Sequence, residues 1–267
     1  MVESLSRCVK WDASGGKSGS AFLKTLDDRF IAKELSRAEL QAMETFAPAY
    51  FDYMSSAVTA NRPTLLAKIF GCFKISFKKT HKEKSSRTKM TQMNLLVMEN
   101  LFYDQQFSKI YDLKGSTRNR HVHVTGRINE VLLDENLIQT AHLAPFYLRE
   151  HSKRIIRGAL YNDSKFLADL NVMDYSLVVG VDSEKNELVV GIVDYIRTYT
   201  WDKKLESWVK DSAFLANRGE PTIVSPKQYR LRFLDAMERY FPIVPDRWMK
   251  HHDAPEEEIN GVSDLWI

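Results

Sequence analysis

The stretch VMDYSLVVGVDSEKNELVVGIVDY, residues 172–195, decides the fold of this chain. Its two apolar runs, rich in Val, are separated by the turn-forming Ser-Glu-Lys-Asn at 183–186, which predicts an antiparallel hairpin. Asp174 precedes the first run, and Asp194 lies at the end of the second. An aspartate at a strand end is commonly only a solvated side chain, but a hairpin brings its two strands together. The stretch therefore predicts two carboxylates in one cleft.

Helical patterns lie on both sides of this hairpin in the sequence. Residues 145–170 carry apolar side chains at helical spacing. Beyond the hairpin, Ser225 is a predicted N-cap, with Pro226 at the first helical position and Gln228 two positions later. The segment 199–224 between them is polar and basic with weak periodicity, which is typical of a functional connection.

The N-terminal part of the chain predicts a sheet with one helix. The alternating runs AFLKT and RFIAKEL indicate two strands joined by a turn. Ser36 and Glu39 then have capping-box spacing at the start of a helix, which Pro48 is expected to kink or end. Two apolar runs, 65–77 and 93–102, predict two further strands.

Charge is distributed unevenly along the 267 residues, although the net charge is only +3. Residues 251–267 contain five acidic residues and no Lys or Arg, so the remaining 30 acidic residues against 38 basic ones leave +8 on residues 1–250. Such a body suits an anionic partner such as nucleotide, phospholipid or nucleic acid. Nucleic acid is the weakest of these, because no RNA- or DNA-reading motif accompanies the charge.

A basic run between two predicted strands favours a membrane surface as one such partner. It is expected to be a mobile loop near an anionic leaflet. Its basic residues, against the single acid Glu83, are Lys74, Lys78, Lys79, Lys82, Lys84, Arg87 and Lys89.

Cysteine content and hydropathy predict a cytoplasmic protein. Cys8 and Cys72 are too few for a disulfide framework, which favours a reducing compartment. No apolar run approaches the roughly 18 residues of a membrane span, and the N-terminus lacks a signal-peptide core. Any membrane contact is therefore expected to be peripheral.

The Gly/Ser-rich segment SGGKSGS, residues 14–20, suggests nucleotide binding. A Walker A loop is excluded, because its first Gly falls on Trp11 and the segment precedes strands rather than a helix. A kinase-type loop needs a Lys on a nearby strand and a Glu on the next helix, and Lys33 and Glu39 supply both. Taken alone the segment favours a flexible linker; with these two residues in order, phosphate binding is favoured.

A protein kinase also carries the strings H-R-D and D-F-G, and neither occurs here. Asp174 and Asp194 are the candidates for the corresponding base and metal ligand. A peptide substrate is therefore disfavoured, although the loop and Lys33 are shared with protein kinases.

Several segments together resemble the phosphatidylinositol phosphate kinases, in the family's order and over residues 14 to about 249. Class III, the phosphatidylinositol 3-phosphate 5-kinases, is the most similar class. The resemblance implies an α+β, two-lobed fold of antiparallel sheets with packed helices, distantly similar to protein kinases. It places an N-terminal lobe at 1–101, a C-terminal lobe at 102–250 and an acidic, disordered tail at 251–267. The segments are GGKSGSAF, FIAKEL, LLVMENLF, YDLKGSTRNR, VMDYSLVVG, VVGIVDYIRTYTWDKKLE and SPKQYRLRF.

The resemblance also implies roles for individual residues at an ATP site. Lys33 would hold the ATP phosphates and Glu39 would pair with Lys33. Backbone groups of Met98, Glu99 and Asn100 would hydrogen-bond adenine. The loop over the phosphates would comprise Gly15, Gly16, Ser18, Gly19 and Ser20.

On the lipid side, the resemblance makes Asp174 the carboxylate that orients or deprotonates the inositol hydroxyl and Asp194 the Mg²⁺ ligand. Lys114 and Arg120 would neutralise phosphate on the lipid head group, because cations suit a phosphomonoester. The implied activation loop contributes Lys203, Lys204 and Glu206. Without the resemblance, the plainer interpretation is that Lys114, Arg118 and Arg120 only solvate a loop, with Asp112 paired to one of them. The Lys203–Lys204 pair is then interpreted as part of a solvent-exposed helix face.

The implied activity is ATP- and Mg²⁺-dependent phosphorylation of the 5-hydroxyl of phosphatidylinositol 3-phosphate, giving phosphatidylinositol 3,5-bisphosphate. A phosphatidylinositol phosphate kinase of another class, such as a phosphatidylinositol 4-phosphate 5-kinase, and a non-catalytic phosphoinositide-binding scaffold are the alternatives. The resemblance suggests peripheral binding to endosome or vacuole membranes, with scaffold and phosphatase partners. Class III members carry lipid-binding and chaperonin-like regions ahead of the kinase, so a catalytic fragment or an unusually short protein is expected.

Overall fold

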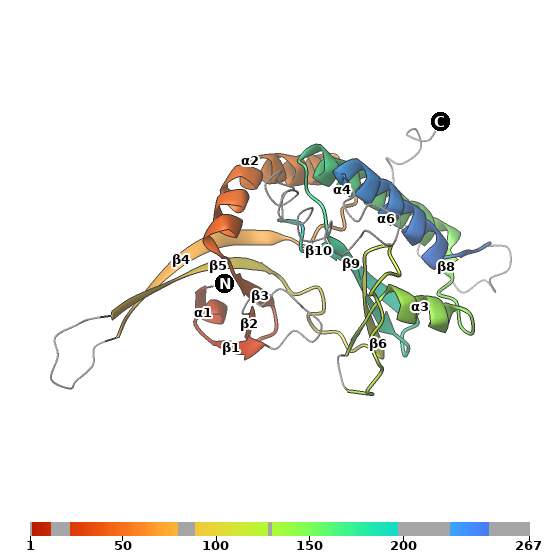
Figure 1. Ribbon diagram of the computed structural model, residues 1–267, viewed down its shortest axis with the longest axis horizontal. Helices are drawn as coiled ribbons and strands as arrows, with labels where there is room; N and C mark the ends of the chain where they lie inside the picture. Colours follow the sequence, from red (N-terminus) through yellow and green to blue (C-terminus); the bar gives the residue numbers. More distant parts are fainter. Residues whose placement is uncertain (1, 12–21, 80–88, 128–129, 197–224, 246–267) are drawn as a thin grey trace, which may run out of the picture.

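A computed structural model of the chain describes residues 2–11, 22–79, 89–127, 130–196 and 225–245. After a short helix, α1 (Val2–Leu5), the first sheet has the order β1-β2-β3-β5-β4, with every neighbouring pair antiparallel. Figure 1 shows the long β4–β5 hairpin projecting away from the helices. The bounds of the strands are β1 (Cys8–Trp11), β2 (Phe22–Thr25), β3 (Phe30–Glu34), β4 (Ile69–Lys79) and β5 (Lys89–Glu99).

The second sheet has the order β10-β9-β6-β7. Its pairs are antiparallel except for β6 and β7, which run parallel. A small parallel pair, β8 (Leu148–Arg149) with β11 (Ile243–Val244), lies apart from both sheets. The bounds in the second sheet are β6 (Lys109–Leu113), β7 (Val131–Leu132), β9 (Ser176–Asp182) and β10 (Glu187–Val193).

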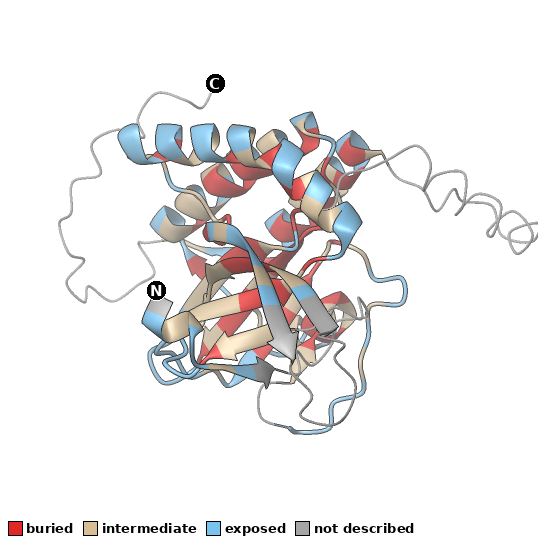
Figure 2. Cartoon of the chain, turned by 90° about the vertical axis from the view of Figure 1, so that its left-hand side faces the viewer, coloured by how far each residue is buried: buried red, intermediate tan, exposed pale blue. Residues whose placement is uncertain are grey.

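Four longer helices accompany the sheets in the described part of the chain. α4 and α6 pack side by side along the top of the view in Figure 1, and α3 lies next to β6. Figure 2 shows the buried segments gathered where helices meet sheets. The bounds of the helices are α2 (Arg37–Thr59), α3 (Asp134–Ala141), α4 (Glu150–Asp169) and α6 (Pro226–Tyr240).

A buried carboxylate joins α2, the segment before β4 and α4. Asp163 on α4 accepts hydrogen bonds from Tyr53 Oη at 2.5 Å, Thr64 Oγ1 at 2.9 Å and the Leu65 amide at 2.6 Å. Burial raises the pKa of Asp163, although these donors and Arg62 oppose the shift. Since buried carboxylates are costly unless they are hydrogen-bonded, this arrangement fixes α2 against α4.

The sequence predictions of element type are largely confirmed. The chain is α+β with antiparallel sheets and packed helices, and Ser36 and Ser225 both form capping boxes. Of the two effects predicted for Pro48, a kink or an end of its helix, the second does not occur, because α2 continues to Thr59. Aromatic burial explains this, since Tyr50 lies beyond Pro48 and packs on Phe46 and Tyr195.

Two further expectations concern the membrane. The basic run is only partly a loop, because Lys74, Lys78 and Lys79 belong to β4 and Lys89 to β5. Its other members and the tail at 251–267 lie outside the described residues. Among the described residues, no helix is both long and apolar enough to cross a bilayer.

Candidate functional site

Strand register brings three candidate residues to one end of the second sheet. Ser176 pairs with Val193, so Asp174 and Asp194 flank the same end of the β9–β10 hairpin. Leu113 of β6 pairs with Leu177 of β9, so Lys114 leaves the sheet at that end as well. The β6–β9 pairing joins residues that are distant in sequence, because Leu113 and Leu177 are 177 − 113 = 64 positions apart.

Lys33 lies between two carboxylates. Its Nζ is 3.4 Å from Glu39 Oε1 and 3.3 Å from Asp194 Oδ1. The Lys33 side chain is only 4% exposed, whereas that of Asp194 is 47% exposed. The Asp194 carboxylate is therefore fixed by a buried cation and still accessible to a ligand.

The capping box of α2 orients Glu39. Its Oε2 accepts a hydrogen bond from the Ser36 amide at 2.9 Å, and the Glu39 amide donates to Ser36 Oγ at 3.2 Å. Burial raises the pKa of Glu39, but the Ser36 hydrogen bonds and Lys33 outweigh it and hold the pKa below its usual range. One local motif thus begins the helix and positions the partner of Lys33.

Lys114 contacts the predicted catalytic carboxylate directly. Its Nζ donates to Asp174 Oδ1 at 2.6 Å and to the Asp174 carbonyl oxygen at 2.8 Å. The neighbouring Tyr175 is fully buried, and its carbonyl oxygen accepts a hydrogen bond from the Tyr229 hydroxyl of α6. Asp174 is thus held by Lys114, which directly follows β6, and its neighbour Tyr175 is held by Tyr229 of α6. The Asp174 side chain is still 46% exposed.

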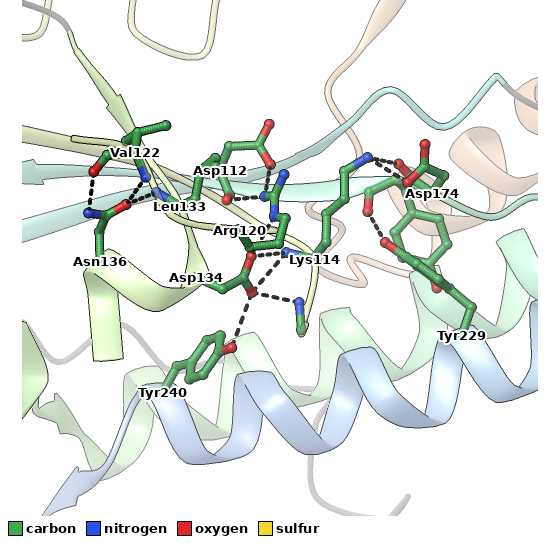
Figure 3. A network of polar contacts seen from close by, with 12 residues as sticks. Asp112, Lys114, Arg120, Val122, Leu133, Asp134, Asn136, Asp174, Tyr229 and Tyr240 are labelled. Carbon is green, nitrogen blue, oxygen red and sulfur yellow. Dashed lines mark hydrogen bonds and ion pairs between the residues drawn. The ribbon is translucent and has the colours of Figure 1, made fainter. Parts of the chain in front are cut away.

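A fully buried aspartate, Asp134 at the start of α3, holds the loop that carries Lys114 (Figure 3). It accepts hydrogen bonds from the Lys114 amide at 3.1 Å, the Gly115 amide at 2.7 Å and Tyr240 Oη at 3.1 Å. Burial and the Asp134 charge raise the pKa of Tyr240. α3, α6 and the loop after β6 therefore share one polar centre.

Arg120 belongs to the same centre. Its Nε donates to Asp134 Oδ2 at 2.9 Å, and its Nη2 donates to Asp112 Oδ1 at 2.7 Å and to the Asp112 carbonyl oxygen at 2.5 Å. Desolvation opposes the charge, but the Asp112 and Asp134 carboxylates hold the pKa of Arg120 above its usual value. A head-group phosphate would have to compete with these two carboxylates for the Arg120 guanidinium.

The backbone at this end of the sheet is unusual. Asp174 has φ 66° and Asp194 has φ 59°, both in the left-handed region. Gly115 has φ 70°, and a Cβ there would lie 2.9 Å from Ala236 Cβ, so the loop after β6 needs glycine. Non-glycine residues in this region are characteristic of turns and of functional sites.

The expected adenine contacts are largely engaged within the protein. The Glu99 amide donates to the Lys68 carbonyl oxygen at 2.9 Å, and the Asn100 amide donates to the Arg29 carbonyl oxygen at 3.1 Å. Met98 lines a small cavity together with Asp194, and this cavity holds only about 10 Å³. The amides of Glu99 and Asn100 are therefore already hydrogen-bonded within the protein, whereas Met98 offers an apolar side chain to this cavity.

Many predicted site residues lie outside the described ranges. They include the acidic and basic members of the implied activation loop and the whole implied phosphate loop: Gly15, Gly16, Ser18, Gly19, Ser20, Lys203, Lys204 and Glu206. The described residues contain no group of three or more His, Cys, Asp or Glu placed to hold a metal ion.

Two features escaped the sequence prediction. Asp134 follows the short strand β7 and opens a helix, which is usual for a solvated helix start, so its burial has no local signal. The direction of the Lys114 side chain depends on the β6–β9 pairing, which no local pattern specifies.

The sequence profile of the phosphatidylinositol-4-phosphate 5-kinase family matches residues 5–189 and 183–240. The 1-phosphatidylinositol 3-phosphate 5-kinase FAB1 of Saccharomyces cerevisiae is 54% identical over 252 residues, which is 93% of this chain and 11% of that protein. The human 1-phosphatidylinositol 3-phosphate 5-kinase is 50% identical over 251 residues, which is 92% of this chain and 12% of that protein. The putative 1-phosphatidylinositol-3-phosphate 5-kinase FAB1C of Arabidopsis thaliana is 50% identical over 249 residues, 92% of this chain and 15% of that protein. The chain thus spans less than a sixth of the length of these relatives.

Proposed function

The chain belongs to the phosphatidylinositol-4-phosphate 5-kinase family, and from this premise we propose that it transfers the γ-phosphate of ATP to the 5-hydroxyl of phosphatidylinositol 3-phosphate. The product is phosphatidylinositol 3,5-bisphosphate. The observation that carries the transfer chemistry is the contact of buried Lys33 with both Glu39 and Asp194. The substrate rests on relatives about 50% identical over more than 90% of the chain, which are named as 1-phosphatidylinositol 3-phosphate 5-kinases.

In this proposal the two sheets form the two lobes of a kinase-like arrangement. Lys33, from the first sheet, binds ATP phosphate, and the Gly-rich segment 14–20 covers it. Asp194 lies at the end of the second sheet and within 3.3 Å of Lys33, which supports a nucleotide at the junction of the sheets. Met98 packs against adenine from β5.

The residue that accepts the proton in this mechanism is Asp174. The inositol 5-hydroxyl oxygen attacks the γ-phosphorus, the bond from that phosphorus to the ADP oxygen breaks, and the hydroxyl proton passes to Asp174. Lys114 holds the carboxylate at 2.6 Å, and in this proposal it also neutralises phosphate on the head group. Arg120 and Asp134 act on Asp174 indirectly, by fixing the loop that carries Lys114.

The donor set at Asp194 fits Mg²⁺. Mg²⁺ in such enzymes is bound by one or two carboxylates together with substrate phosphates, and Asp194 offers an accessible carboxylate beside the ATP lysine. Bound with ATP, Mg²⁺ supplies charge neutralisation at the transferred phosphoryl group. Asp194 would hold the Mg²⁺ ion, and Lys33 would bind the ATP phosphates.

Membrane association completes the proposal. The lipid substrate requires a peripheral contact with an anionic surface, for which the basic residues of the β4–β5 hairpin and the pair Lys203 and Lys204 are the candidates. The resemblance to class III phosphatidylinositol phosphate kinases makes endosome or vacuole membranes the proposed location.

A lipid-panel assay tests the substrate. The protein is incubated with ATP, Mg²⁺ and vesicles of phosphatidylinositol, phosphatidylinositol 3-phosphate or phosphatidylinositol 4-phosphate, and the product isomer is identified by chromatography. We expect the 3-phosphate to yield the 3,5-bisphosphate, and Asp194→Asn to fold normally without turnover. Preference for the 4-phosphate would assign another class of the family. Binding without transfer to any of these lipids would assign a scaffold.

A further inference from the structure

A basic pocket lies beside the loop that carries Lys114. It has a volume of about 610 Å³ and is bounded by the segment after β6, by α3 and by α6. Tyr240 lines it, whereas Asp174 lies near Tyr229 at the other end of α6 (Figure 3). The two tyrosines are eleven positions apart on the helix, which is about 16 Å at 1.5 Å per residue. Gly115, which directly follows Lys114, and Arg232, three positions after Tyr229, also line the pocket. The pocket therefore adjoins the loop whose Lys114 contacts Asp174, and it reaches away from Asp174 to Tyr240.

The charge lining this pocket is entirely positive among the described residues. Arg118, Arg232 and Arg239 line it together with His142, and no Asp or Glu does. The buried Asp134 at the start of α3 has its oxygens occupied by Arg120, Tyr240 and backbone amides. An anion entering the pocket thus meets guanidinium groups without an acidic neighbour in the wall.

Two of these arginines retain donor capacity. Arg232 Cζ lies 5.0 Å from the centre of the Tyr229 ring, and Arg232 Nε is buried with no hydrogen-bond partner within the described ranges. Arg239 pairs with Asp235 at 2.9 Å, but both side chains are exposed, so the pair is weak. A guanidinium has five N–H groups, and a single carboxylate contact leaves others for a ligand.

Guanidinium groups and hydroxyls select a phosphomonoester. The fork of Arg matches phosphate oxygens, and Ser116 and Thr117 add hydroxyl groups to the same wall. The volume is in the range of small-molecule sites and is much larger than one phosphate ion needs. Leu137 and Ile138 provide an apolar wall for the C–H face of a ring.

We propose that this pocket is a further anion site, which binds a phosphorylated inositol beside the phosphotransfer site. The phosphomonoester is the recognised chemistry, whether it is carried by a lipid head group or by a soluble inositol phosphate. The choice of inositol rests on the proposed function; the recognition of phosphate by the arginines does not.

Calorimetric titration tests the proposal in the Asp194→Asn protein, so that binding is measured without turnover and does not depend on kinase activity. The probes are inositol 1,3,5-trisphosphate and inorganic phosphate. Arg118→Gln with Arg239→Gln removes two exposed charges from the pocket. Lys109→Gln with Lys165→Gln removes two exposed charges elsewhere, and Lys165, like Arg239, is in an exposed i,i+4 ion pair.

We expect the pocket pair to weaken binding of the trisphosphate by at least about tenfold and the control pair by less than about twofold. Ala141→Trp, which fills the pocket without changing its charge, is expected to weaken binding as well. Unchanged affinity in both pocket variants, or no saturable binding by the parent protein, would overturn the proposal.

Vesicle co-sedimentation distinguishes the source of the phosphate. One set of vesicles contains phosphatidylinositol 3,5-bisphosphate. The control set contains enough phosphatidylserine to carry the same total negative charge. Selective loss of bisphosphate-vesicle binding in the pocket pair assigns a lipid head group, and an effect confined to the soluble trisphosphate assigns a soluble ligand. Both results support the site, whereas equal binding of every variant to every probe contradicts it.

Discussion

Glu39 has two roles at the scale of a single residue, because it closes the capping box of α2 and contacts Lys33. We predict that Glu39→Gln lowers the free energy of unfolding at pH 7 by about 1 kcal/mol. The folded-state pKa lies below the ordinary value of 4.5, so this contribution is present above about pH 4.5 and is lost as the pH falls through the folded pKa.

Urea denaturation at pH 7, 5, 4 and 3 measures this difference. The gap between the parent protein and Glu39→Gln is expected to narrow steadily below pH 4.5. Ser36→Ala is the comparison, since it removes the hydroxyl but leaves the ionisable group. A gap that stays constant down to pH 3 would show that the Glu39 charge contributes nothing.

Gly115 is the second prediction at this scale. Gly115→Ala is expected to cost about 2–4 kcal/mol, because it combines a left-handed φ with a Cβ 2.9 Å from Ala236 Cβ. Gly126→Ala is the matched control, since Gly126 has φ 76° and nothing within 4 Å of the added Cβ, so only about 1 kcal/mol is expected. Thermal unfolding of both variants measures the difference, and equal losses would refute the packing argument.

Local residue patterns predicted much of the candidate site. The sequence alone predicted the Ser36–Glu39 capping box and the order of Lys33 before Glu39, because these residues lie close together along the chain. The contact between Lys114 and Asp174 could not be predicted from local sequence, because it joins residues 60 positions apart. The same holds for Arg120, whose partners include Asp134 on α3.

At the scale of elements, a buried lysine holds the end of α6 to α4. Lys153 Nζ donates to the carbonyl oxygens of Glu238 at 2.9 Å and Phe241 at 2.8 Å, and it lies 3.3 Å from Glu238 Oε2. Helix carbonyls at a C-terminus have no partner within the helix, so a cation here satisfies them. Desolvation lowers the pKa of Lys153, although Glu238 opposes the shift.

We predict that Lys153→Met destabilises the fold by about 2–4 kcal/mol, since it keeps the apolar stem but leaves buried carbonyls unpaired. Arg157→Met is the control. The Arg157 side chain is 65% exposed, and its Nε is as far as 3.9 Å from Glu238 Oε2. Such an exposed, long ion pair is weak, so a change within about 0.5 kcal/mol is expected. Chemical denaturation measures both. Similar losses would show that the carbonyl contacts are unimportant.

Element types were predicted more reliably than element ends. Periodicity and caps located α4, α6 and the β9–β10 hairpin, because each buries one face along a contiguous stretch. Pro48 does not end α2, since tertiary packing of Tyr50 outweighs the lost helix hydrogen bond. β7 and β8, of two residues each, are too short for a periodic signal.

At the scale of the whole molecule, the positive charge of residues 1–250 is proposed to act at the membrane. We predict that Lys203→Glu with Lys204→Glu lowers phosphorylation of vesicle-bound phosphatidylinositol 3-phosphate more than basal ATP hydrolysis. Reversal of two charges near an anionic leaflet weakens binding by about tenfold or more at low salt, and added salt reduces the effect.

Paired measurements of lipid phosphorylation and ATP hydrolysis at two salt concentrations separate docking from chemistry. Lys109→Glu with Lys165→Glu makes the same change in net charge at described, exposed positions. Equal losses in lipid phosphorylation and ATP hydrolysis would argue against a docking role for Lys203 and Lys204.

The central claim is that Asp174, held by Lys114 and lying at the same hairpin end as Asp194, accepts the proton during phosphoryl transfer. The most direct test is the initial rate of phosphate transfer from ATP to phosphatidylinositol 3-phosphate by Asp174→Asn. Asp169→Asn, in an exposed pair with Lys165, is the control. We predict a loss of about 10²- to 10⁴-fold for Asp174→Asn at unchanged thermal stability and a normal rate for the control. A rate within a few-fold of the parent protein for Asp174→Asn would contradict the account.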